Sequence, residues 1–176
     1  MPDATDLKQL SEQGKKDFEA GQYEAAAAKF RSAADGYGAL GDPLNAAELK
    51  NNLSVALLKL GQNQAALDII EGTEQVFSGA GDLRRQAMAI GNRATALEAL
   101  HRWDDALAAY EQSAAVFAQA GEGELRSIVL KSAAGLKLRR GKVSDSAFKM
   151  IGSLEAKPQP SFFERVLKSI LRFVQR

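Results

Sequence analysis

The sequence predicts an all-α protein, a right-handed α-solenoid of about four helical hairpins followed by a C-terminal amphipathic helix. Two observations predict this fold. Similar residue types recur every forty residues along the 176-residue chain, as in repeat architectures. Within each repeat the apolar residues follow helical spacing, and no segment shows the alternation of a strand. We expect the repeats at residues 1–155, a Pro-containing linker at 156–160 and the last helix at 161–176.

When the chain is aligned in rows of forty residues, similar residues fall in the same column, and these columns define the repeat. Two helices cross closely only where side chains are small, so Gly14 and Ala26 mark the expected crossing of the first pair, with Phe30 beside it. The small columns are Gly14, Ser54, Ala94, Ala134 and Ala26, Ala66, Ala106, Ser146. Large apolar residues form the column Phe30, Ile70, Tyr110, Met150. Turn residues form the columns Gly21, Gly61, His101, Gly141 and Gly41, Gly81, Gly121.

Each repeat is predicted to contain two helices. In the second repeat, Asp42 supplies an N-cap and Pro43 stands at the first helical position. Gly61 ends this helix, because glycine readily adopts the left-handed conformation at a helix C-terminus. A second helix is expected from about residue 63 to residue 78. In the fourth repeat Ser146 replaces alanine, and we expect its second helix to be short.

A family resemblance rests mainly on the third repeat. It contains Ala89-Ile90-Gly91-Asn92-Arg93-Ala94, Leu100-His101-Arg102-Trp103-Asp104-Asp105-Ala106-Leu107 and Tyr110-Glu111-Gln112-Ser113-Ala114. These segments resemble the tetratricopeptide repeat, in its longer, forty-residue subclass, over about residues 5–155. The resemblance implies a non-enzymatic adaptor or scaffold that binds a peptide or protein segment. It also implies that the first helix of each pair lines a concave groove.

Helical phase assigns residues to the groove that this resemblance implies. An asparagine side chain offers one acceptor and two donors, so a ladder of asparagines can hold the backbone of an extended peptide. The basic residues would pair with an acidic side chain or a terminal carboxylate. In the alternative interpretation the asparagines only solvate a helix face. The expected peptide-binding residues are Asn51, Asn52, Val55, Met88, Asn92, Thr95, Lys131 and Arg139.

The composition argues against catalysis. There is no cysteine, and the single histidine, His101, has no second imidazole with which to hold a metal. No serine elbow or convergent carboxylate pair is present, so we expect no enzyme activity, cofactor or metal. The basic run at 137–142 has no interleaved aromatic residue, and we therefore expect no nucleic-acid partner. The lack of cysteine and the acidic, polar start predict a cytoplasmic protein.

Charge divides the chain into two parts. Residues 1–125 contain 11 Lys/Arg against 19 Asp/Glu, a net charge of −8, while residues 126–176 contain 12 against 3, a net charge of +9. Such asymmetry predicts an anionic partner for the C-terminal part. In the alternative interpretation it is only chance scatter of surface charge along a solenoid. The asymmetry also allows head-to-tail self-association of the acidic and basic ends.

Residues 161–176 separate apolar and charged residues onto opposite halves of a helical wheel. Three interpretations remain open. The helix covers the last hairpin as a cap, or it attaches the protein to an anionic membrane as a peripheral assembly factor. In the third interpretation it docks on a partner protein, or in the groove of its own or a neighbouring molecule. The residues that would contact a membrane or partner are Phe162, Phe163, Arg165, Lys168 and Arg172.

Truncation after Lys157 tests these alternatives. If the last helix binds membrane, the truncated chain no longer co-sediments with anionic vesicles and its melting temperature is unchanged, because basic and apolar groups are lost together. A cap instead predicts a large fall in melting temperature. Vesicle co-sedimentation and thermal unfolding, measured on both chains, distinguish the two outcomes.

Overall fold

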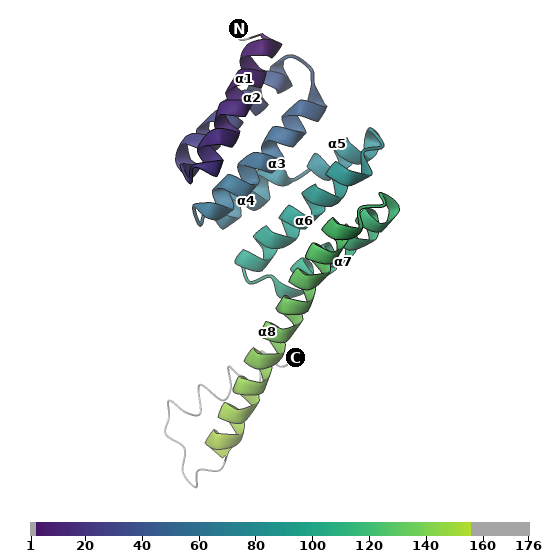
Figure 1. Ribbon diagram of the computed structural model, residues 1–176. Coiled ribbons are helices and arrows are strands. Elements are labelled where there is room, and N and C mark those ends of the chain that lie inside the picture. Colours follow the sequence, from purple (N-terminus) through teal and green to yellow (C-terminus); the bar gives the residue numbers. More distant parts are fainter. Residues whose placement is uncertain (1–2, 156–176) are drawn as a thin grey trace. The chain divides into compact units, whose positions relative to one another are not determined.

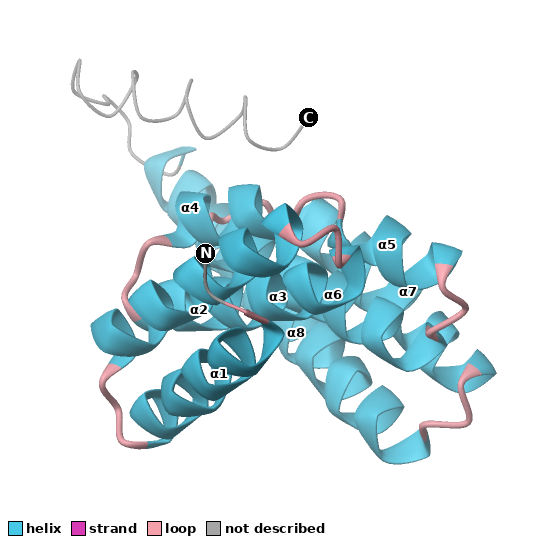
Figure 2. Ribbon diagram, turned by 90° about the horizontal axis from the view of Figure 1, so that it is seen from above, coloured by secondary structure: helices cyan, strands magenta, loops and turns pink. Residues whose placement is uncertain are grey.

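The computed structural model describes residues 3–155, and the chain divides into two compact units, Met1–Ala133 and Ala134–Arg176. Short turns connect helices throughout the described residues, which contain no β-strand (Figure 1, Figure 2). The predicted all-α fold is confirmed. The helices are α1 (Ala4–Glu19), α2 (Tyr23–Ala39), α3 (Pro43–Lys59), α4 (Asn63–Ile70), α5 (Thr73–Gly79), α6 (Leu83–Ala99), α7 (Trp103–Gln119) and α8 (Gly123–Glu155).

In the first unit, helices that follow one another pack as pairs. Helix α1 packs against α2, and α6 packs against α7, as expected for the first and third repeats. Helix α3 packs against both α4 and α5, which together form the second half of the second repeat. Successive pairs stack because α2 also contacts α3, and because α4 and α5 both contact α6 (Figure 1). This arrangement is that of an α-solenoid.

The predicted turn columns end helices through a left-handed residue. Gly61 has a φ of 72°, and His101, the non-glycine member of its column, has a φ of 60°. The backbone N–H of Gly61 donates to the carbonyl of Leu58 at 3.1 Å, and that of Gln62 donates to Leu57 at 2.9 Å. These two bonds satisfy carbonyls that the end of α3 would otherwise leave without a partner. Local backbone chemistry therefore sets where these helices stop.

Aspartates begin the first helices of the second and third repeats. The Asp42 side chain accepts a hydrogen bond from the Asn45 N–H at 3.1 Å, and Pro43 occupies the first turn. The Asp82 side chain accepts a hydrogen bond from the Arg85 N–H at 2.9 Å. These backbone hydrogen bonds lower the pKa of Asp42 and the pKa of Asp82, since the ionised carboxylate is the better acceptor. The N-cap predicted at Asp42 is confirmed.

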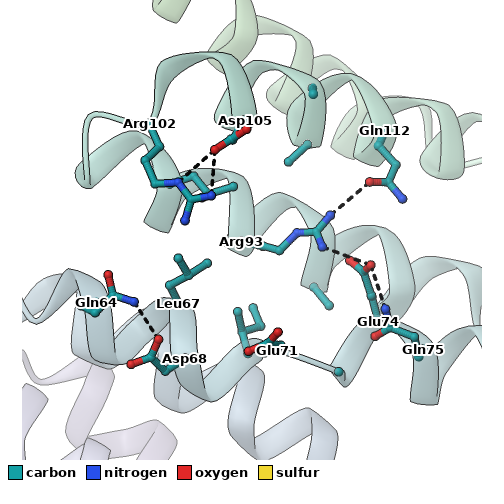
Figure 3. Close-up of a pocket in the computed structure, with 16 residues that line it drawn as sticks. Gln64, Leu67, Asp68, Glu71, Glu74, Gln75, Arg93, Arg102, Asp105 and Gln112 are labelled. Atoms are coloured by element: carbon teal, nitrogen blue, oxygen red, sulfur yellow. Dashed lines mark hydrogen bonds and ion pairs between the residues drawn. The ribbon is translucent and has the colours of Figure 1, made fainter.

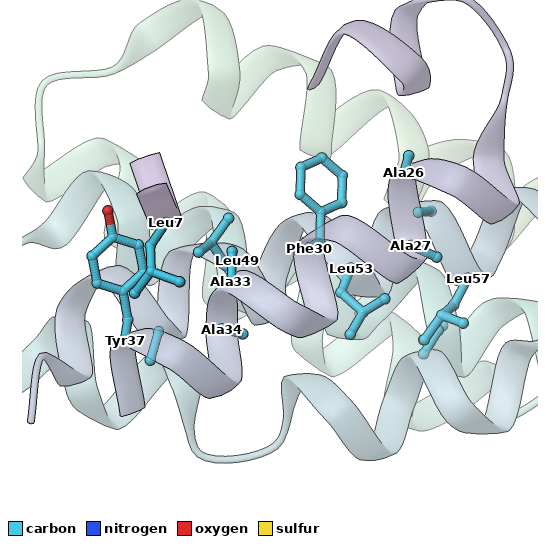
Figure 4. Packing of buried hydrophobic residues seen from close by; sticks show 14 residues of the cluster. Leu7, Ala26, Ala27, Phe30, Ala33, Ala34, Tyr37, Leu49, Leu53 and Leu57 are labelled. Carbon is cyan, nitrogen blue, oxygen red and sulfur yellow. The ribbon is translucent and has the colours of Figure 1, made fainter. Parts of the chain in front are cut away.

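Helices α1 and α2 cross at Gly14, the position that the pattern of small residues predicted. A Cβ atom added at Gly14 of α1 would lie 2.8 Å from Cε1 of Phe30 on α2, so the ring occupies the space that a side chain would need. Gly36 of α2 makes the same close approach to Leu7 of α1. Phe30 and Leu7 belong to one buried cluster, together with residues of α3 (Figure 4). Ala26 is fully buried in that cluster.

The prediction of a single helix over residues 63–78 is wrong, because the helix breaks between α4 and α5. Glu71 is extended, with φ −57° and ψ 133°, and Gly72 has a φ of 81°. The Thr73 hydroxyl donates to the carbonyl of Ile70 at 2.8 Å, which satisfies one acceptor at the break. In the first and third repeats the position of Gly72 is occupied by residues that continue a helix. A glycine in the left-handed conformation explains why this repeat differs.

The turn expected at Gly141 is absent, because α8 continues through this residue to Glu155. Gly141 does not have a positive φ, unlike Gly21 and Gly61 of the same column. Glycine permits a left-handed turn but does not impose one. The fourth repeat is one long helix and not a hairpin over the residues that the structure describes.

Replacing Gly14 with alanine should lower the free energy of unfolding by about 1–3 kcal/mol, because the new methyl group would overlap the buried Phe30 ring. The matched control is Gly38→Ala in α2, where an added Cβ meets open space and should raise stability by up to about 1 kcal/mol. Urea unfolding followed by circular dichroism measures both values. Equal effects of the two substitutions would contradict the close crossing.

Candidate functional site

A groove follows α1 and α3 on the face that the sequence assigned to ligand binding. Its first part has a volume of about 250 Å³, and its second part has a volume of about 340 Å³. The two parts are neighbours, because Lys15 lines both. We call this surface the α1–α3 groove. Its first part is lined by Lys15, Phe18, Glu19, Phe30, Asn52 and Val55, and its second part by Lys8, Ser11, Glu12, Lys15, Tyr37, Asn45, Glu48 and Leu49.

The first part of the α1–α3 groove has an apolar floor. The buried Phe30 ring and the half-buried Phe18 and Val55 side chains form it. Phe18 is held in place by an edge contact with Tyr23, at 5.2 Å between ring centroids. Asn52 is half-buried beside this floor, and its amide makes no hydrogen bond to another described residue. The groove thus combines apolar contact area with an amide that can still donate and accept.

Charged side chains form the rim of the α1–α3 groove. Lys15 Nζ lies 2.9 Å from Glu12 Oε1. The hydrogen bond from Lys15 lowers the pKa of Glu12, and the same bond raises the pKa of Lys15. Glu48 on α3 accepts a hydrogen bond from Arg85 Nη1 of α6 at 3.1 Å. The rim therefore presents both signs of charge.

Two of the predicted asparagines bind each other, so the predicted ladder needs correction. Asn51 is buried, with 5% of its surface exposed, and its Oδ1 accepts a hydrogen bond from Nδ2 of Asn92 at 2.9 Å. This bond joins α3 to α6. A buried polar side chain needs such a partner, because leaving it without one costs free energy. Asn51 and Asn92 are thus engaged within the protein, while Asn52 keeps the predicted position in the groove.

The other predicted groove residues have different surroundings. Met88 on α6 is exposed. The Thr95 hydroxyl donates to the carbonyl of Gly91 at 3.1 Å, so it already has a partner on its own helix. Lys131 is exposed on the part of α8 that belongs to the first unit, and Arg139 is exposed in the second unit. The predicted contact residues Phe162, Phe163, Arg165, Lys168 and Arg172 lie outside the described residues.

A second hollow, which the sequence did not predict, lies between α4–α5 and α7, with α6 beneath it (Figure 3). Its volume is about 580 Å³. Arg93 on α6 bridges it, since Nη1 contacts Glu74 of α5 at 3.2 Å and Nη2 contacts Gln112 of α7 at 3.1 Å. Gly72 lines this hollow, so the break between α4 and α5 helps to shape it. The signal in the sequence was the isolated Gly72 inside an otherwise helical pattern.

Two other kinds of feature are absent from the described part of the chain. Among the described side chains, no three His, Asp or Glu are grouped so that they could hold a metal ion. No described helix is long and apolar enough to cross a membrane.

Stacked helix pairs with an open groove along one face define a helical-repeat protein of the interaction class. The family model of the soluble NSF attachment proteins (SNAP) matches residues 6–155. The chain therefore belongs to the SNAP family, a family of non-catalytic, helical-repeat adaptors of protein interaction. A comparison with curated proteins gave no match. The helical-repeat character predicted from the sequence is confirmed, but the family is SNAP and not the tetratricopeptide family itself.

The bond between Asn51 and Asn92 should contribute to stability. Replacing Asn92 with alanine leaves the buried Asn51 amide without its partner, and the free energy of unfolding should fall by about 1–3 kcal/mol. The control is Asn52→Ala, which should change stability by less than about 0.5 kcal/mol. Urea unfolding of both variants makes the comparison. A loss no greater for Asn92→Ala than for Asn52→Ala would rule out a stabilising role for the bond.

Proposed function

We propose that this chain is an adaptor that binds an extended peptide or protein segment in the α1–α3 groove. The observation that carries the proposal is an open groove with an apolar floor. Beside this floor lies the Asn52 amide, which has no hydrogen-bond partner among the described residues. Membership of the SNAP family supports a non-enzymatic protein-interaction role. The groove specifies where on this chain such an interaction would take place.

Apolar contact would provide most of the affinity in this groove. A partner side chain placed over Phe18, Phe30 and Val55 removes apolar surface from water on both molecules, at about 25 cal/mol for each Å². The Asn52 amide can bond to the N–H and C=O groups of an extended backbone, which every sequence possesses. The groove would therefore select a partner by its apolar anchor and the charges beside that anchor.

The rim would influence which segments bind. Lys15 and Glu12 already form an ion pair, so a ligand charge must compete with an existing partner there. Exposed pairs of this kind contribute little free energy, typically about 0–1 kcal/mol. A ligand can consequently rearrange them at low cost. We expect rim charges to adjust specificity and the apolar floor to set the affinity.

Residues 161–176 support a second candidate function, attachment to an anionic membrane. The supporting observation is the sequence pattern alone, with basic and apolar residues on opposite sides of the predicted helix. This function and groove binding are compatible, because they use different parts of the chain. Truncation after Lys157 separates them, since the α1–α3 groove lies entirely within residues 8–55.

Peptide selection on the intact chain tests the proposed groove. Peptides selected by display against the wild-type protein should bind the Val55→Lys variant at least about tenfold more weakly, because a charged side chain would occupy the apolar floor. The control is Ala28→Lys, which adds the same charge at an exposed position of α2 that does not line the groove. Isothermal titration calorimetry measures each affinity. Equal affinities for the two variants would remove the proposal.

A further inference from the structure

The hollow between α4–α5 and α7, which we call the α4–α7 groove, is a surface distinct from the α1–α3 groove. Helix α6 contributes Ala89, Arg93 and Leu97 to it. These residues are spaced four apart and therefore share one side of the helix. Met88 and Asn92, which were expected to bind peptide, lie on a different side of α6. The α4–α7 groove thus goes beyond the function proposed above and does not depend on it.

The charges in the α4–α7 groove do not balance. Four acids line it, Asp68, Glu71, Glu74 and Asp105, against two arginines, Arg93 and Arg102. Both arginines already have acidic partners inside the groove (Figure 3). Arg93 Nη1 lies 3.2 Å from Glu74, and Arg102 Nη2 lies 2.8 Å from Asp105. Two negative charges are left over.

The leftover charges belong to Asp68 and Glu71. Asp68 accepts a hydrogen bond from Gln64 Nε2 at 2.7 Å, but Gln64 is neutral and leaves the charge uncompensated. Glu71 forms no ion pair with another described residue and is exposed at the C-cap of α4. The C-terminal end of a helix carries partial negative charge, which adds to that of the two carboxylates. This part of the groove favours a positive charge.

The floor of the α4–α7 groove suits a polypeptide. Small residues, Ala89, Ala108 and Ala109, let a backbone approach closely, and the partly buried Leu67 adds apolar area. Arg93 fixes α5 and α7 relative to α6 through Glu74 and Gln112, so the groove is preformed. A preformed groove reduces the entropy cost of binding. Its volume of about 580 Å³ accommodates several side chains.

We propose that the α4–α7 groove binds a lysine- or arginine-bearing segment of a partner protein. A cationic side chain of that segment pairs with Asp68 and Glu71, and the stem of that side chain lies along Leu67 and the alanine floor. Charge complementarity selects this occupant. An acidic segment would face two uncompensated carboxylates in a groove that holds four acids against two arginines.

The test uses the full chain and a fluorescein-labelled synthetic peptide of ten alternating lysine and alanine residues. Fluorescence anisotropy measures its affinity for the wild type and for the double variant Asp68→Asn/Glu71→Gln. Both substitutions keep the shape of exposed side chains, and thermal unfolding confirms that the variants fold. The matched control is Glu24→Gln/Asp35→Asn, which removes the same charge from exposed positions of α2. A glutamate–alanine peptide serves as the second probe.

The proposal expects the lysine peptide to bind the wild type and the control variant alike, and the double variant about fivefold more weakly. The glutamate peptide should bind none of them. Equal weakening in the double variant and the control would mean that only net charge matters, and this would overturn the proposal. Absence of binding to the wild type would also overturn it. So would an equal loss in Val55→Lys, because the peptide would then occupy the α1–α3 groove.

Discussion

The close crossing of paired helices is the constraint on which the rest of the structure depends. Gly14 leaves room for the Phe30 ring, and the buried Ser54 hydroxyl donates to the carbonyl of Ala66 at 2.8 Å where α3 and α4 meet. Ser113 makes the same kind of bond to the carbonyl of Ala87, at 2.7 Å, between α7 and α6. Side chains larger than these would separate the helices and lose both the packing and the hydrogen bonds.

Local backbone chemistry explains which parts of the fold the sequence could predict. The turns at Gly61 and His101 were predictable, because a residue that ends a helix recurs at a fixed phase. Gly72 and Gly141 show where this reasoning stops. Glycine tolerates both helical and left-handed conformations, so its presence alone does not decide between them. The decision depends on how the following segment packs, which is long-range information that a repeat pattern does not contain.

The candidate sites show the same limit. Helical phase predicted that Asn52 and Val55 face a groove, because phase determines which side of a helix a residue occupies. Both residues line the α1–α3 groove, and their role in peptide binding stays a prediction. It could not show that Asn51 would meet Asn92, since that contact requires α3 and α6 to lie close together. The α4–α7 groove was missed because it depends on a helix break. Similarly, columns of small and apolar residues indicated a helical repeat but did not distinguish the SNAP family from the tetratricopeptide family.

Contacts between α3 and α6 hold the two grooves at a fixed spacing. Helix α3 lines the first groove, α6 lines the second, and the bond between Asn51 and Asn92 joins them. Arg85 of α6 makes a second contact between these helices, because its guanidinium forms an ion pair with Glu48 of α3 at 3.1 Å. The same guanidinium also pairs with Asp82 at 2.6 Å. The hydrogen bond to Asp82 raises the pKa of Arg85.

An adaptor that holds two chains at once needs two surfaces that differ in chemistry, since identical surfaces would compete for one ligand. Here an apolar floor with paired rim charges is combined with an acidic groove on another side of the stack. Pairing with exposed carboxylates is screened at high ionic strength, whereas apolar contact is not weakened by this screening. The two surfaces would therefore respond differently to the same change in solution. A rigid connection between them would let binding at each surface bring two partners to a defined separation.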